Sequence, residues 1–154
     1  MNICLLAEHP QYCPEIAQWY FDEWACLSPH ASIERVIADV IAKSHSKSLL
    51  PLSYIAFSDT TLAGVAELKY REHKGYPDYE HWLGGVFVSP NYRRQGVAKA
   101  LITKALHHAD GLGIRYLYLQ TEDKNRILYQ QFGFHPLHET EPGIFIMMRD
   151  CFEI

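Results

Sequence analysis

A basic, glycine-containing turn carries the residues best suited to chemistry in this chain. It follows an apolar segment and opens an amphipathic one, in the run Val86-Phe87-Val88-Ser89-Pro90-Asn91-Tyr92-Arg93-Arg94-Gln95-Gly96-Val97-Ala98. The first turn of a helix has N–H groups without intrahelical partners, and they lie at the positive end of the helix dipole. Gly96 lets a ligand approach the backbone, while Arg93 and Arg94 add positive charge beside it. The pattern predicts an anion site, with pyrophosphate as the best-fitting anion.

The periodicity of apolar residues predicts the elements that lead to this turn. They are a strand over residues 1–6, helices beginning at Pro14 and after Ser32, hairpin strands over 52–57 and 62–68, and a strand over 82–88. The helix after Ser32 is predicted to bury a stripe made of Ile33, Val36, Ile37, Val40 and Ile41.

The second half of the chain continues the alternation of helices and strands. Its predicted elements are a helix after Gly96, a strand over 116–119, a short helix that stops at Gly133, and strands over 134–137 and 144–148. The resulting order, β-α-α-β-β-β-α-β-α-β-β, describes an α/β (α+β) fold on a mixed sheet. Because a helix links the strands over 82–88 and 116–119, these two strands are predicted to be parallel.

Composition limits the class of protein. The 154 residues, 48% of them hydrophobic, predict one globular domain over residues 1–154. A net charge of −4 argues against a nucleic-acid partner, and no apolar run is long enough to span a membrane. The N-terminus lacks the pattern of a secretory signal, and the four cysteines are widely spaced. We therefore expect a cytoplasmic protein with free thiols.

Three motifs resemble those of the GCN5-related N-acetyltransferases, the GNAT family. Arg93-x-x-Gly96-x-Ala98 is similar to the family's coenzyme-binding signature, and Tyr129-x-x-x-Gly133-Phe134 to a second family element. The segment from Trp82 to Val88 looks like the family's fourth strand, and the predicted order of elements matches the GNAT fold over nearly the whole chain. The resemblance implies transfer of an acetyl group from acetyl-CoA to an amine.

The resemblance also implies where acetyl-CoA would bind. The backbone of Val86, Phe87 and Val88 would hold the pantetheine arm, and Gly84-Gly85 just upstream fits a bulge or a close backbone approach. The pyrophosphate would lie against a turn and helix start formed by Arg93, Arg94, Gln95, Gly96, Val97, Ala98 and Lys99. The alternatives are glycines that relieve packing against a helix, and a capped surface helix with two solvated arginines.

Tyr129 is the candidate general acid, because in the family the corresponding phenol lies beside the sulfur and can protonate the departing thiolate. The alternative is a core aromatic residue with a satisfied hydroxyl. Many family members carry an asparagine seven residues earlier that contacts the pantetheine arm, but this chain has Glu122 there. Asn125, three residues out of register, is the remaining candidate for that contact.

The general base and the acceptor site are less sharply defined. The base candidates are Glu67, Glu80 and His81, and for each of them an ordinary role as a solvated or strand-end residue is the stronger alternative. Aromatic residues that could attract an ammonium group in an acceptor groove are Trp19, Tyr20, Trp24, Tyr76, Tyr79 and Trp82, although packing explains each of them equally well. The nine histidines show no ligand spacing, so no metal cofactor is expected.

The resemblance thus implies an acetyl-CoA-dependent N-acetyltransferase in which a primary amine attacks the thioester directly in a ternary complex, and a small-molecule amine is the favoured acceptor. Two alternatives stay open: an enzyme that acetylates a protein or peptide, and a non-catalytic sensor that only binds acyl-CoA. A strand such as Ile144–Met148 could also pair across a homodimer.

Overall fold

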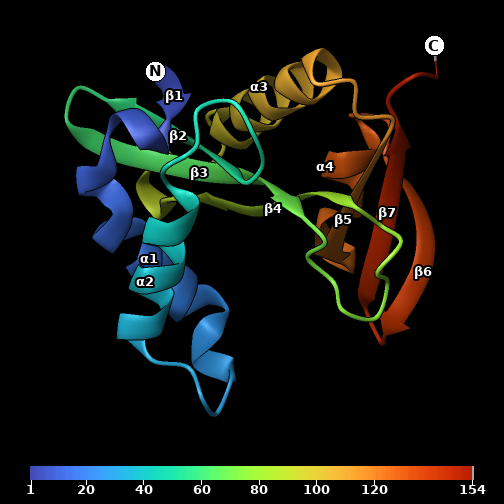
Figure 1. Ribbon diagram of the computed structural model, residues 1–154, viewed down its shortest axis with the longest axis horizontal. Helices are drawn as coiled ribbons and strands as arrows, with labels where there is room; N and C mark the ends of the chain where they lie inside the picture. The colour runs from blue at the N-terminus through green and yellow to red at the C-terminus, as the bar shows by residue number, and fades with distance from the viewer. Residues whose placement is uncertain (154) are drawn as a thin grey trace. The chain divides into compact units, whose positions relative to one another are not determined.

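The computed structural model describes residues 1–153, whose strands and helices follow the predicted order (Figure 1). The strands are β1 (Asn2–Leu5), β2 (Leu52–Ser58), β3 (Thr61–Tyr70), β4 (His81–Val88), β5 (Tyr116–Glu122), β6 (His135–Glu141) and β7 (Ile144–Asp150). The helices are α1 (Cys13–Glu23), α2 (Ile33–Lys43), α3 (Val97–Gly111) and α4 (Arg126–Gln130). The predicted mixed α+β fold is confirmed, and β5 extends three residues beyond its predicted end.

The strands form one mixed sheet in the order β1-β2-β3-β4-β5-β7-β6. The parallel pairing of β4 with β5 is confirmed by a register that joins His81 to Leu117 and Trp82 to Tyr118. β7 is antiparallel to β5 on one side and to β6 on the other. The expectation that Ile144–Met148 could pair across a homodimer is therefore wrong, because the backbone of this strand is already paired on both sides within the chain.

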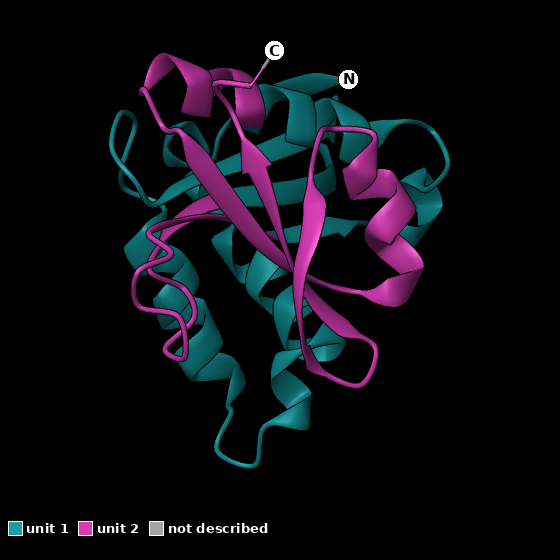
Figure 2. Cartoon of the chain, turned by 90° about the vertical axis from the view of Figure 1, so that its right-hand side faces the viewer, with its two compact units in different colours: residues 1–67, 85–105 teal, residues 68–84, 106–154 magenta. Residues whose placement is uncertain are grey.

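The chain divides into two compact units that alternate along the sequence (Figure 2). Unit 1 comprises residues 1–67 and 85–105, and unit 2 comprises residues 68–84 and 106–154. The boundaries fall inside β3, β4 and α3, so each unit contains a part of these three elements.

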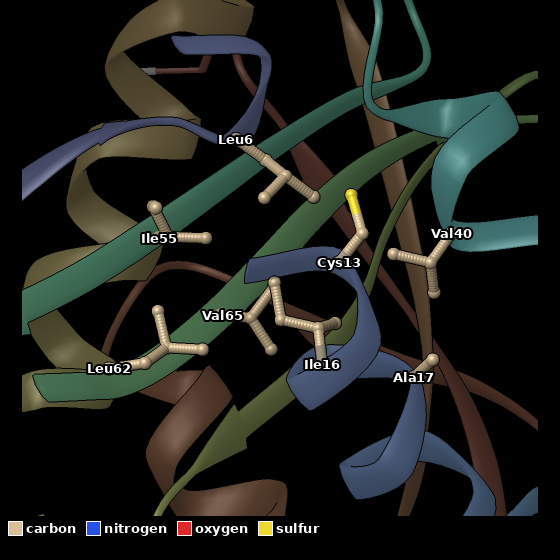
Figure 3. Packing of buried hydrophobic residues seen from close by; sticks show 8 residues of the cluster. All are labelled: Leu6, Cys13, Ile16, Ala17, Val40, Ile55, Leu62 and Val65. Carbon is tan, nitrogen blue, oxygen red and sulfur yellow. The ribbon is translucent and has the colours of Figure 1, made fainter. Parts of the chain in front are cut away.

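The core of unit 1 forms where α1 and α2 pack on β2 and β3. Figure 3 shows the buried side chains that point toward one another there: Leu6, Cys13, Ile16, Ala17, Val40, Ile55, Leu62 and Val65. The predicted cap of α2 is confirmed, since the Ser32 hydroxyl accepts a hydrogen bond from the Arg35 N–H at 3.2 Å. Ile41 was expected in the buried stripe but is 42% exposed. Val40, which the predicted stripe also contains, is in the core cluster, and Ile41 lies about 100° around the helix from it.

In unit 2, alternate residues of β5 are buried. These include Leu117 and Leu119, together with Ile146 and Met147 of β7 and Phe134 after α4. Within the described residues 1–153, no helix is long and apolar enough to cross a membrane.

Candidate functional site

Gly85 lets a tyrosine of α1 approach β4 closely. Its φ of +57° lies in the left-handed region, and its carbonyl accepts a 2.8 Å hydrogen bond from the Tyr20 hydroxyl. A Cβ atom at this position would lie 2.6 Å from Tyr20 Oη and 3.0 Å from Glu67 Oε1. The predicted close approach is present, and it is made by a neighbouring helix, as the packing alternative required.

Ring contacts and a backbone hydrogen bond hold the C-terminal end of β4 in place. The Phe87 ring packs against Trp19 at 5.1 Å and Trp24 at 6.3 Å between ring centroids. The packing alternative therefore holds for both tryptophans, and their role in an acceptor groove stays a prediction. Beyond the strand, the Ser89 N–H donates to the Ala63 carbonyl at 2.8 Å, which holds the exit of β4 against β3.

The basic turn opens α3 as the sequence predicted. The Gly96 carbonyl accepts the Ala100 N–H at 3.0 Å, so α3 begins with the N–H groups of Val97, Ala98 and Lys99 in its first turn. Gly96 has a φ of +80°, and apart from its own chain neighbours no protein atom lies within 4 Å of the position that its Cβ would occupy. The space in front of the helix start is therefore open, which suits an anion that approaches the main chain.

The two arginines of the turn differ in their surroundings. Arg93 Nε donates to the Val88 carbonyl at 3.0 Å, and its guanidinium lies 5.6 Å from the centre of the Phe87 ring. Arg93 thus ties the turn back to β4. Arg94 is exposed and has a φ of +61°, while the Gln95 amide donates to the Asn91 carbonyl at 3.2 Å.

Tyr129 lies in unit 2, where burial raises the pKa of its phenol to about 12. Its side chain is 9% exposed, and its ring packs edge-on against Phe134 at 6.1 Å. The Phe134 N–H donates to the Tyr129 carbonyl at 3.3 Å, so the Tyr-x-x-x-Gly-Phe motif folds back on itself at the end of α4. A phenol with the ordinary pKa of 10.0 is already protonated at neutral pH, and the raised pKa extends this form, which an acid requires, to higher pH.

Asn125 and two of the base candidates lie at element ends in unit 2. Asn125 precedes α4 and is half-buried, with no capping hydrogen bond from its side chain. Glu80 is exposed, with its carboxylate 3.8 Å from Arg71 Nη2. The half-buried His81 ring meets the Tyr70 ring edge-on at 5.6 Å.

Glu67 differs from the other base candidates because it is buried. It is 2% exposed on β3 of unit 1, and its Oε2 lies 3.7 Å from Lys43 Nζ. Within residues 1–153 it is the only buried carboxylate. The structure brings Glu67 to Gly85 and Tyr20, next to the β4 segment expected to hold the pantetheine arm.

A stack of aromatic rings in unit 2 joins the 71–80 loop to β5 and β6. Tyr79 lies face to face with Tyr118 at 4.1 Å and 4°, and Tyr76 stacks on Tyr79 at 5.2 Å. The Tyr79 hydroxyl is 2.6 Å from His138 Nε2. Neither Tyr118 nor His138 is among the aromatic residues predicted from the sequence for an acceptor groove. A groove role for Trp82 is wrong, because Trp82 is only 2% exposed and donates its indole N–H to the Tyr79 carbonyl at 2.6 Å.

The sequence profile of the Acetyltransferase (GNAT) family matches residues 13–134. An aminoglycoside N(6')-acetyltransferase type 1 of Salmonella typhimurium is 32% identical over 108 residues, which cover 63% of this chain and 69% of the relative.

Two solved structures extend the similarity to nearly the full length. The PaiA N-acetyltransferase of Thermoplasma acidophilum, solved in complex with coenzyme A, is 25% identical with a TM-score of 0.65, covering 97% of this chain and 99% of that one. The putative acetyltransferase YncA of Salmonella typhimurium, solved with acetyl-CoA, shares the fold with a TM-score of 0.70 at 15% identity, covering 100% and 95%.

Proposed function

The chain belongs to the GNAT family and is an N-acetyltransferase, and from this premise we propose that it acetylates a primary amine of a small molecule. The aminoglycoside N(6')-acetyltransferase relative supports the choice of a small-molecule acceptor. The structural observation that carries the coenzyme-binding part of the proposal is the open position at Gly96, at the start of α3, with the exposed Arg94 beside it. We propose that the pyrophosphate of acetyl-CoA binds there to the main-chain N–H groups of residues 96–99.

The pantetheine arm would then run along the backbone of Val86, Phe87 and Val88, with Asn125 as a further polar contact. The side chain of Phe87 is already committed to packing, so its contribution would come from the main chain. An N–H group of this strand, aimed at the thioester oxygen, would stabilise the negative charge that develops as the amine attacks.

The proposed reaction is direct attack within a ternary complex. The amine nitrogen bonds to the thioester carbon, the carbon–sulfur bond breaks, and Tyr129 donates to the departing sulfur as general acid. Because a thiol has a pKa of about 8.5, below that of Tyr129, hydrogen-bond donation to the developing thiolate makes up the larger part of this role. The proton lost by the amine passes to a base, for which Glu67, Glu80 and His81 are the candidates.

The test is a panel of amines assayed for release of free thiol from acetyl-CoA: aminoglycosides, polyamines, amino acids and short peptides. The proposal expects turnover with a small amine, and initial rates that show a sequential rather than a ping-pong pattern. Turnover of peptides alone would identify a protein-modifying enzyme. Binding of coenzyme without turnover of any amine would identify a sensor and overturn the proposal.

We also propose that the protein is located in the cytoplasm, which fits its four free cysteines.

The role of Tyr129 has its own test. Tyr129→Phe should lower kcat by about 100-fold or more while the affinity for acetyl-CoA stays unchanged, since only the proton donor is removed. Tyr116→Phe is the matched control, because it deletes the same atom from an exposed ring of unit 2. Equal activity of the two variants would remove Tyr129 from the mechanism.

A further inference from the structure

Three side chains near the N-terminus offer a mixed set of metal ligands outside the site described above. They are Cys4 near the end of β1, Glu8 in the short 3-10 turn that follows (Leu6–Glu8), and His9 directly after that turn. One ligand atom from each, a sulfur, a carboxylate oxygen and a ring nitrogen, lies within 4.8 Å of the other two. Together, sulfur, nitrogen and oxygen donors match the preference of Zn²⁺, which accepts all three.

The register of β1 explains why Cys4 faces the other two ligands. β1 is antiparallel to β2, with Asn2 opposite Phe57 and Cys4 opposite Ile55. Residues directly opposite each other point to the same face of a sheet, so Cys4 shares a face with Phe57. The His9 ring packs on that same Phe57, with 5.2 Å between the ring centroids.

The turn between β1 and α1 holds the histidine in place. The His9 N–H donates to the Leu6 carbonyl at 2.8 Å, and the His9 ring also contacts the Tyr12 ring at 6.1 Å. Leu6 itself is buried in the core of unit 1. Two of the three ligands, Cys4 and His9, are therefore half-buried on packed elements, and Glu8 is exposed and able to change its rotamer.

The dimensions of the cluster suit a tetrahedral ion. With bonds of about 2.0–2.3 Å, the ligand atoms of a tetrahedral zinc site lie about 3.3–3.8 Å apart. The three ligand atoms lie within 4.8 Å of one another, so binding an ion would require them to move closer together, and Glu8 is the exposed member of the set. Three protein ligands leave the fourth position to water.

We propose that Cys4, Glu8 and His9 form a Zn²⁺ site that clamps the 3-10 turn onto β1. The site belongs to unit 1 and uses no residue assigned to acetyl transfer. Its role is structural: a bound ion would fix the link between the edge strand of the sheet and α1, so zinc should raise the melting temperature of the protein by mass action. The proposed zinc site is independent of the proposed acceptor and of the acetyl-transfer mechanism.

The experiment is a titration of the tag-free full chain with Co²⁺, a coloured substitute for Zn²⁺, followed by competition with Zn²⁺. We expect one ion per chain, a thiolate-to-cobalt charge-transfer band, and visible bands of the intensity that a tetrahedral site gives. Cys4→Ser should abolish the charge-transfer band, and His9→Gln should weaken binding by more than about tenfold. Cys26→Ser is the matched control, because Cys26 is an exposed thiol of the same unit and should bind like the unaltered protein.

Folding of each variant is checked by far-ultraviolet circular dichroism, and the melting temperature is measured with and without Zn²⁺. The proposal expects zinc to raise the melting temperature of the unaltered protein and of Cys26→Ser, but not that of His9→Gln. The absence of saturable binding, or a charge-transfer band that survives in Cys4→Ser, would overturn it.

Discussion

Replacement of Gly85 by alanine should destabilise the protein through two separable effects. The first is conformational, because an alanine held at a φ of +57° costs about 1–2 kcal/mol. The second is steric: the new Cβ would lie 2.6 Å from Tyr20 Oη, so the tyrosine must move and give up its hydrogen bond to the Gly85 carbonyl. That loss adds about 1 kcal/mol.

The sum, about 2–3 kcal/mol, corresponds to a fall in melting temperature of about 4–12 °C for a chain of this size. The assay is urea unfolding followed by circular dichroism, which gives the free energy of unfolding directly. Gly113→Ala is the control for the conformational part. Gly113 has a φ of +74°, and a Cβ there would meet no atom within 4 Å.

A double-mutant cycle separates the contact from the backbone. In a Tyr20→Phe background the hydroxyl is gone, so Gly85→Ala should cost about 1 kcal/mol less than in the unaltered protein. If Gly85→Ala and Gly113→Ala cost the same, or if Tyr20→Phe leaves the cost of Gly85→Ala unchanged, the close approach of α1 is not the reason for glycine at this position.

Further predictions concern stability and its dependence on pH. Ser32→Ala should lower the free energy of unfolding by about 1 kcal/mol through loss of the α2 cap, whereas Ser48→Ala, in an exposed loop, should leave it unchanged. Trp82→Phe should cost about 2 kcal/mol, because it leaves a cavity and strands the Tyr79 carbonyl, as urea unfolding would show. Burial raises the pKa of Tyr129 from 10.0 to about 12, so its contribution to stability is complete below pH 10 and is lost as pH rises toward 12. Tyr129→Phe should therefore flatten this alkaline fall in the free energy of unfolding, and an unchanged fall would contradict the assignment.

The features that the sequence predicted correctly are those that depend on residues close together in the chain. The cap at Ser32, the helix start at Gly96 and the turn at Gly133 depend on side chains and dihedral angles of adjacent positions, so local patterns suffice. The parallel pairing of β4 and β5 followed from a general rule of chain connection rather than from any single residue.

The features that sequence missed depend on contacts between distant segments. Tyr79 and His138, whose side chains are in hydrogen-bond contact, are 59 positions apart, and no local sequence pattern around either residue indicates this contact. The burial of Glu67 likewise depends on neighbours from α1, α2 and β4 that no periodicity in β3 reveals. The error at Ile41 has the same origin, since the apolar stripe of α2 is wider than the surface that covers it.

Spacing also failed to reveal the proposed metal ligands. Cys4, Glu8 and His9 are close in sequence, but the chain changes from strand to 3-10 turn between them. The directions of these three side chains therefore follow neither the period of a helix nor that of a strand. The register of β1 on β2 supplies the missing information.

Calorimetric titration of coenzyme A into two leucine variants tests the central claim most directly. Gly96 and Gly143 both have a φ of +80° with no atom near the Cβ position, so Gly96→Leu and Gly143→Leu carry the same backbone cost. Only the first places a side chain where we propose that the pyrophosphate meets the start of α3. The account predicts that Gly143→Leu binds coenzyme A like the unaltered protein and that Gly96→Leu does not. Equal binding by both variants would contradict it.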